Sequence, residues 1–229
     1  MDSALARWSA VALCVSTALF AILVAVVLLW DDADRLDVRF VAWVNRTAPE
    51  SLVDAMRVAT YTGSALVLVV VALVSGGLLA RRGRTHAAAL MVAATVGGLV
   101  TTQILKAAVR RTRPELDEPY VQLTTYAFPS GHALAATATY GALAIVLYTS
   151  LRARRERRLL LAGFAALIVL VAASRVVLGA HYLLDVLAGT VGGVALLSAL
   201  VLAFGLGSYR RFRFGVRRDE QTQRPGIDA

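Results

Sequence analysis

Residues 8–30 read "WSAVALCVSTALFAILVAVVLLW" and contain no charged side chain. A helix over this run would place Trp8 and Trp30 roughly 33 Å apart, near the two interfaces of a bilayer whose hydrocarbon core is about 30 Å thick. A cleaved signal peptide also carries an apolar core, but that core is normally about 7–15 residues long. The run therefore predicts a membrane-spanning helix that remains in the protein.

The rest of the 229-residue chain continues this pattern, since 58% of its residues are hydrophobic and its mean hydropathy is +0.67. Soluble domains are rarely so apolar. We therefore predict an all-α integral membrane protein with six transmembrane helices in one domain, residues 1–208, followed by a basic cytoplasmic tail, residues 209–229. The predicted spans are about 8–30, 62–80, 85–108, 131–149, 159–178 and 183–206. Residues 38–60 mix apolar and charged positions and predict an extracytoplasmic amphipathic segment.

Basic residues determine the expected orientation. Six spans place "RRGR" (81–84), "RARRERR" (152–158) and the start of the tail on one side of the membrane, and the acidic "DDADRLD" (31–37) on the other. The positive-inside rule makes the arginine-rich side cytoplasmic, with both termini there, in the inner (plasma) membrane of a cell. The net charge of +9 is thus explained by membrane orientation, and we expect no nucleic acid as a partner.

One basic stretch, "RRTR" at 110–113, falls on the outer side and breaks this trend. It is either a tolerated exception or a site for an anionic ligand. Lys106 precedes Arg113 by seven residues, close to two helical turns, so we expect both cations on one helix face before Pro114 turns the chain away. Lys106 alone could equally be a residue that snorkels to the interface.

A second cluster is "PSGH", residues 129–132, at the start of an apolar run. A helix N-terminus offers unpaired N–H groups and a partial positive charge, which together favour an anion. Ser130 could cap this helix or donate to a ligand oxygen, Gly131 would let the backbone approach a ligand, and His132 could transfer a proton. An ordinary helix cap with an incidental histidine is the alternative.

The third cluster lies in "SRVVLGAHYLLD", residues 174–185. Arg175 is near the outer end of a span, and Gly179 is placed to end that helix. His181 and Asp185 are four residues apart, so we expect them to stack on one face, where the carboxylate would orient the imidazole. A structural His–Asp pair between helices is the alternative.

Together, "KAAVRRTRP", "PSGH" and "SRVVLGAHYLLD" resemble the three signature motifs of the type 2 phosphatidic acid phosphatase superfamily, in order and without a departure. The resemblance implies that His181 is a nucleophile forming a phosphohistidine, that Asp185 orients it, and that His132 protonates the leaving oxygen and later activates water. It also implies a set of residues that bind the phosphate: Lys106, Arg113, Ser130, Gly131 and Arg175. No metal ion or other cofactor is implied, and Asp117 and Glu118, the nearest acidic pair, are interpreted as a solvated loop.

The expected activity is hydrolysis of a lipid phosphate or pyrophosphate on the extracytoplasmic side. We favour a polyprenyl pyrophosphate of cell-wall synthesis, because Arg110 and Arg111 could serve a second phosphate. Phosphatidylglycerophosphate and phosphatidic acid remain alternatives, as does transfer of the phosphoryl group to an acceptor other than water. An anionic lipid transporter is the alternative from another class. Gly189 and Gly193 have the spacing of helix packing, either inside the bundle or in a homodimer.

Overall fold

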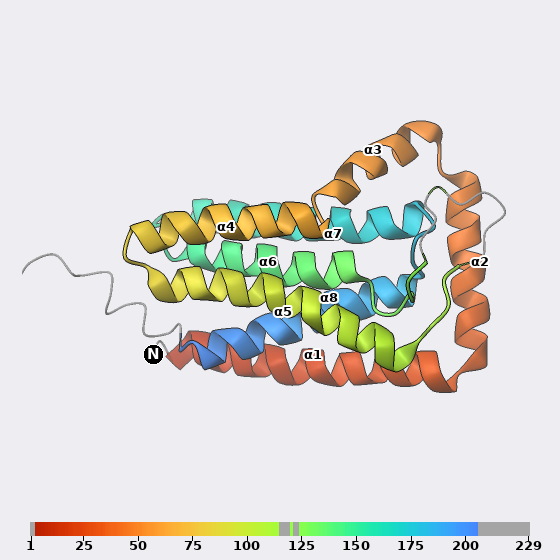
Figure 1. Ribbon diagram of the computed structural model, residues 1–229, viewed down its shortest axis with the longest axis horizontal. Helices are drawn as coiled ribbons and strands as arrows, with labels where there is room; N and C mark the ends of the chain where they lie inside the picture. The colour runs from red at the N-terminus through yellow and green to blue at the C-terminus, as the bar shows by residue number, and fades with distance from the viewer. Residues whose placement is uncertain (1–2, 115–119, 121–123, 206–229) are drawn as a thin grey trace, which may run out of the picture.

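A computed structural model describes residues 3–114, 120 and 124–205. This part of the chain contains helices and no strand. Figure 1 shows a bundle of long helices with one helix lying across its end. The helices are α1 (Ser3–Leu29), α2 (Asp31–Thr47), α3 (Glu50–Tyr61), α4 (Ala65–Arg81), α5 (Thr85–Val109), α6 (Gly131–Tyr148), α7 (Arg154–Val177) and α8 (Leu183–Ala203).

Five helices are long and apolar enough to cross a membrane by themselves: α1, α5, α6, α7 and α8. The sixth candidate span is α4 together with α3, which meet at a bend of 46°. Large apolar side chains on the outside of the bundle are exposed, Leu19 and Leu73 among them, as expected where lipid is the solvent. The predicted all-α, six-span architecture is confirmed.

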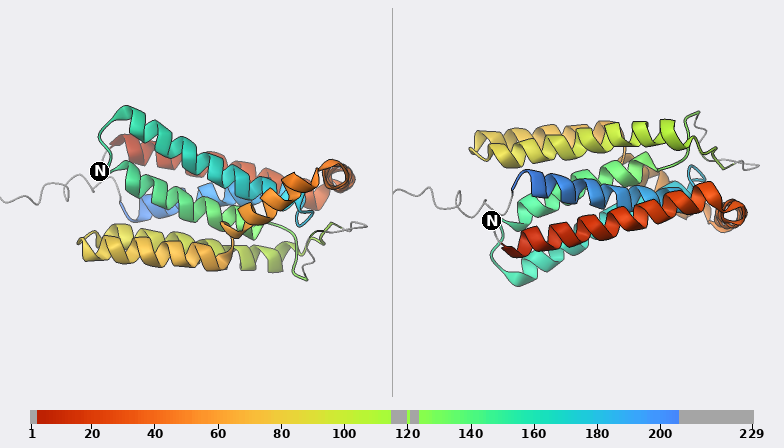
Figure 2. Two further views of the ribbon diagram at one scale, coloured as in Figure 1. Left: turned by 90° about the horizontal axis from the view of Figure 1, so that it is seen from above. Right: turned by 90° about the horizontal axis from the view of Figure 1, so that it is seen from below.

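The layers of the bundle place α6 at its centre. In both views of Figure 2, α6 and α8 lie between the pair α4 and α5 on one side and α1 and α7 on the other. Glycines allow the central helices to approach closely, because a Cβ at Gly189 would lie 2.5 Å from the carbonyl oxygen of Ser130 and one at Gly193 would lie 2.7 Å from that of Leu134. The two glycines therefore pack α8 against α6 inside the bundle, which decides between the two alternatives for them.

The amphipathic segment between the first two spans is two helices, α2 and α3, and it begins at residue 31 rather than 38. Helix α2 lies across the end of the bundle, transverse to the spans (Figure 1). It buries Ala33, Asp37 and Val41 against the bundle and exposes a stripe of Leu36, Phe40 and Trp43.

The opposite end of the bundle carries the arginine-rich loops. Arg84 donates to Ser150 Oγ at 3.0 Å and to Thr149 Oγ1 at 3.1 Å, which joins the α4–α5 loop to the α6–α7 loop. Helix α1 begins and α8 ends at this same end (Figure 1). The predicted grouping of the basic loops is therefore present, although the tail at 209–229 lies outside the described residues.

Candidate active site

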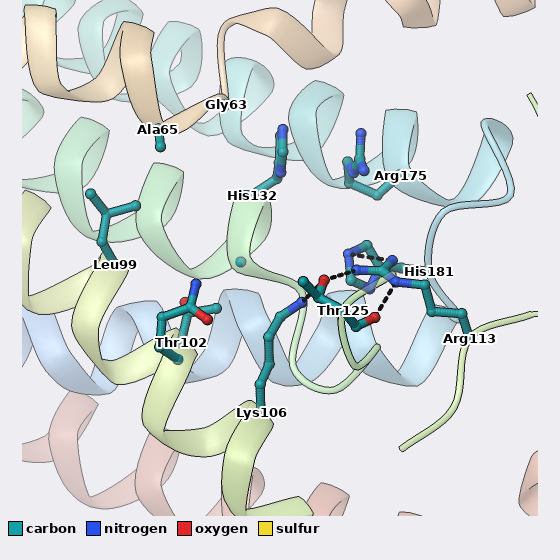
Figure 3. Close-up of a pocket in the computed structure, with 12 residues that line it drawn as sticks. Gly63, Ala65, Leu99, Thr102, Lys106, Arg113, Thr125, His132, Arg175 and His181 are labelled. Atoms are coloured by element: carbon teal, nitrogen blue, oxygen red, sulfur yellow. Dashed lines mark hydrogen bonds between the residues drawn. The ribbon is translucent and has the colours of Figure 1, made fainter. Parts of the chain in front are cut away.

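A cavity of about 220 Å³ lies toward the α2 end of the bundle, lined by residues of α4, α5, α6 and α7 and of the segments that connect the helices. Figure 3 shows its polar side chains converging from α5, α6, α7 and the loops that follow α5 and α7. Its lining includes six residues that the sequence singled out: Lys106, Arg113, Gly131, His132, Arg175 and His181.

Lys106 and Arg113 converge on the segment before α6 rather than along one helix face. Helix α5 ends at Val109, because Arg110 adopts a left-handed conformation with φ of 53°. Arg113 therefore lies in the following loop. Lys106 Nζ donates to Tyr126 O at 2.5 Å and to Thr125 Oγ1 at 3.3 Å, and Arg113 Nη2 donates to the same two atoms at 3.3 and 2.9 Å. The prediction that both cations share one helix face is wrong, because Arg113 lies beyond the end of α5.

Ser130 is the N-cap residue of α6, yet its side chain makes no capping hydrogen bond. Its Oγ is buried without a hydrogen-bond partner, whereas its N–H donates to Asp185 O at 2.9 Å. A buried hydroxyl without a partner is costly, and this one lies next to Gly131 in the chain, although Ser130 itself is not among the residues that line the cavity. His132 follows in the first turn and lines the cavity.

His181 precedes α8 instead of lying on it, because the helix begins at Leu183 with Tyr182 as its N-cap. Its Nδ1 faces Asp185 Oδ2 at 3.5 Å, and its Nε2 lies 3.4 Å from Arg113 Nη1. Burial lowers the pKa of His181 well below its ordinary value, and the positive charges of Arg113 and Arg175 lower it further. The imidazole is therefore neutral and presents Nε2 to the cations of the cavity.

Arg175 is buried, and only part of its guanidinium is held by a hydrogen bond. Its Nη1 donates to Thr60 Oγ1 on α3 at 2.6 Å, while its Nε has no hydrogen-bond partner among the described residues. The positive φ of Gly179, 67°, ends α7 just after Arg175 and allows Ala180 N and His181 N to donate to the Arg175 carbonyl. The predicted helix end at Gly179 is thus present, and it holds Arg175 and His181 at one cavity.

Arg111 does not line the cavity, contrary to its expected role with a second phosphate. It is buried, and its guanidinium donates to three carboxylates, those of Asp34, Asp37 and Asp185. Burial alone would lower the pKa of Arg111, but Asp185 and Asp34 raise it above its ordinary value. The neighbouring Arg110 donates through Nε to Ala107 O and is not a cavity residue either.

Sequence reasoning missed the uncharged lining of the cavity, notably Thr102, Gln103 and Thr125. Thr102 and Gln103 lie one helical turn before Lys106, so their position relative to that lysine could have indicated them. Thr125 lies in a loop and carries no such signal. Asp117 and Glu118 lie outside the described residues.

The model of the PAP2 superfamily matches residues 86–207 of this chain, a range that contains every residue of the three motifs. The chain belongs to the PAP2 superfamily. With its six-span fold, it is a membrane phosphatase of the PAP2 type.

Two relatives in Bacillus subtilis are similar to this PAP2 protein. One is phosphatidylglycerophosphatase B of strain 168, which is 32% identical over 162 residues, covering 70% of this chain and 78% of that one. The other is the crystal structure of a transmembrane PAP2-type phosphatidylglycerolphosphate phosphatase, with a TM-score of 0.75. That alignment covers 90% of this chain and 98% of the other at 23% identity, and it supports the fold.

Proposed function

We propose that this protein hydrolyses a lipid phosphate monoester through a phosphohistidine intermediate, with phosphatidylglycerophosphate as the favoured substrate. The observation that carries the proposal is a single cavity lined by two imidazoles and three cationic side chains, those of Lys106, Arg113 and Arg175. Fixed cations in a site with little water are what a transferring phosphoryl group requires.

In the first step, the lone pair of His181 Nε2 attacks phosphorus while the bond from phosphorus to the lipid oxygen breaks. Protonated His132 gives its proton to the leaving oxygen. Asp185 faces the other nitrogen of His181 and stabilises the charge that develops on the ring.

In the second step, water attacks the phosphohistidine as neutral His132 takes a proton from it, and the N–P bond breaks to release phosphate. The same imidazole thus acts first as acid and then as base. Ser130 Oγ and Arg175 Nε, both buried without partners, supply donors for the phosphate oxygens in both steps.

The choice of a monophosphate follows from the arginines. A pyrophosphate needs cations beyond those for one phosphoryl group, and Arg111, which was expected to supply one, is occupied by carboxylates. The relative named phosphatidylglycerophosphatase B supports the same choice. Polyprenyl pyrophosphate is the alternative that the substrate test includes.

We further propose that the cavity faces the extracytoplasmic side and that the reaction needs no metal. The orientation is supported by the arginine-rich α4–α5 and α6–α7 loops, which lie at the end of the bundle opposite α2 (Figure 1). The cavity is lined by Lys106 in the last turn of α5 and by Arg113 after it, far along the chain from the α4–α5 loop. Metal independence is supported by the donor set, since the residues of the described chain that line the cavity include no carboxylate.

The decisive experiment compares purified wild-type protein with His181→Ala in detergent, measuring phosphate release from phosphatidylglycerophosphate, phosphatidic acid and polyprenyl pyrophosphate. His86→Ala is the matched control, because His86 is at the start of α5, at the opposite end of that helix from Lys106. We expect His181→Ala to abolish release, His86→Ala to retain it, and the monophosphates to be preferred. Full activity in His181→Ala would refute the mechanism, and a preference for the pyrophosphate would refute the substrate.

A chelator arm and a product arm complete the experiment. EDTA should leave turnover unchanged, and a loss restored by magnesium would contradict metal independence. Incubation with an added alcohol tests for phosphoryl transfer, and a phosphorylated alcohol as the main product would make the protein a transferase.

A further inference from the structure

A buried ion cluster behind the cavity connects the interfacial helix α2 to the residue that orients His181. At its centre is Arg111, whose side chain is 5% exposed. Its Nη1 donates to Asp185 Oδ1 at 2.6 Å, and its Nη2 donates to Asp37 Oδ2 at 3.0 Å and Asp34 Oδ1 at 2.5 Å. Its guanidinium also lies over the Tyr182 ring at 4.2 Å.

The cluster determines which oxygen of Asp185 faces the catalytic histidine. Oδ1 is bound by Arg111, and Oδ2 accepts from Tyr182 N at 3.0 Å. Both oxygens are thereby fixed, and Oδ2 remains 3.5 Å from His181 Nδ1. Without Arg111, only the backbone bond would hold this carboxylate, so it could rotate away from the imidazole.

Helix α2 fixes the other end of the cluster. Asp37 Oδ1 accepts from Leu183 N at 2.8 Å, and its Oδ2 accepts from Leu184 N at 3.3 Å. Asp37 on α2 thus provides hydrogen-bond acceptors for backbone N–H groups in the first turn of α8, which have no partner within that helix. A carboxylate at a helix N-terminus is favourable, and here it also joins α2 to the first turn of α8. The position of Asp185 therefore depends on α2 in two ways, because Asp37 binds both the first turn of α8, which carries Asp185, and Arg111, which binds the Asp185 carboxylate.

We propose that Arg111 and Asp37 are positioning residues, which hold Asp185 so that it orients His181 for attack. This inference rests on the proposed phosphohistidine chemistry. Neither residue lines the cavity, so their loss should reduce the rate of the chemical step and leave phosphate binding nearly unchanged. Partners that orient ligand histidines at metal sites are typically worth about 10–100-fold, and we expect a similar loss in kcat.

The test is Arg111→Lys against Arg110→Lys, the same substitution at an adjacent arginine. Lysine keeps the charge but cannot bridge two carboxylates from one planar group. We expect kcat to fall at least about tenfold in Arg111→Lys, with KM and the inhibition constant of inorganic phosphate within about threefold of wild type. Arg110→Lys should stay within about twofold in all three quantities.

Arg113→Ala serves as the opposite control, because it removes a cavity cation and should weaken inhibition by phosphate. Equal activity in the two lysine variants would overturn the proposal. So would a parallel loss of kcat and phosphate affinity in Arg111→Lys, since that pattern means a distorted cavity. Should Arg111→Lys fail to fold, Asp37→Asn carries the same prediction, because the amide keeps an oxygen for Leu183 N while losing the charge that binds Arg111.

A measurement without turnover separates this proposal from the proposed function. NMR of ¹⁵N-histidine-labelled protein in detergent reports the tautomer of His181. We expect the Nδ1–H form, facing Asp185, in wild type and Arg110→Lys, and a mixture of tautomers in Arg111→Lys. An unchanged tautomer refutes the positioning role even if no lipid is hydrolysed, whereas an inactive wild type with the expected tautomers refutes only the proposed function.

Discussion

The substitution Gly189→Ala on α8 should distort the cavity by pushing α8 away from the N-terminus of α6. The added Cβ would lie 2.5 Å from the Ser130 carbonyl oxygen and 3.0 Å from Ala133 Cβ, whereas ordinary contacts lie at 3.4–4 Å. The carbonyl belongs to the backbone at the N-terminus of α6, so no flexible side chain can move aside. Helices α6 and α8 must separate by about 1 Å, the difference between these distances.

This displacement has two measurable consequences. Overpacking in a close-packed interior costs about 1–3 kcal/mol of stability. It also moves Ser130 and His132 relative to His181, and a misplacement of about 1 Å can cost about 100-fold in rate. We therefore expect Gly189→Ala to lower Tm by several degrees and kcat by about 10–100-fold.

The assay is phosphate release in detergent with Tm measured on the same sample. Gly193→Ala has a similar clash, 2.7 Å from Leu134 O, but lies one helical turn farther from the cavity and should lose stability with a smaller loss of kcat. Gly77→Ala and Gly163→Ala are the matched controls, since nothing lies within 4 Å of a Cβ at either position. Wild-type kcat and Tm in Gly189→Ala would refute the close approach of α8 to α6.

Three further predictions address other parts of the structure. Because burial and neighbouring cations lower the pKa of His181, its NMR resonances should not titrate between pH 8 and 5.5. A midpoint near 6.5 would contradict this, because it would mean that the imidazole is exposed to water or that the Asp185 carboxylate outweighs the cations. Thr60→Val removes the hydroxyl that accepts from Arg175 Nη1, and we expect phosphate affinity, measured as an inhibition constant, to fall about three- to tenfold. The control is the same substitution on α2, Thr47→Val. Trp43 is exposed on α2, so we expect it to lie in the membrane interface. With the other two tryptophans replaced by phenylalanine, its fluorescence should be quenched more by labels near the lipid headgroup than by labels at the end of the acyl chain. No quenching by either label would place α2 in water.

The spans were predictable because the bilayer imposes one length and one solvent on each of them. The predicted span at 85–108 compares with α5 at Thr85–Val109, and the one at 131–149 compares with α6 at Gly131–Tyr148. Two helices begin earlier than predicted by the same margin, α7 at Arg154 rather than 159 and α1 at Ser3 rather than 8. Hydropathy detects the hydrocarbon layer, whereas α7 continues through its charged first turn into the interface.

Part of the site was predictable for a similar reason. A charged or titratable side chain in an apolar run is costly, so Lys106, His132, Arg175 and His181 each required an explanation within the sequence. The local geometry was harder to predict. Whether His181 lies on α8 or before it depends on the cap at Tyr182, and whether Arg113 lies on α5 depends on the left-handed Arg110.

The partners of these residues were not predictable. Asp37 lies in an acidic stretch that is typical of a solvated segment, and it meets Arg111 only because α2 folds across the end of the bundle. Thr60 and Arg175 are 115 positions apart in the chain, and they meet because α3 packs against α7. Neither contact leaves a local pattern of spacing or polarity.

The arginine stretch at 110–113 shows how one anomaly in a sequence can have two causes. Three arginines on the acidic side of the protein indicated either a tolerated exception or an anionic ligand, and two of them have different surroundings in the structure. Arg111 binds carboxylates that α2 and α8 supply, while Arg113 faces the cavity, where a phosphoryl group would be the anion. Because Asp185 is among the carboxylates held by Arg111, the arginine bound to protein anions prepares the site in which its neighbour would bind a substrate anion.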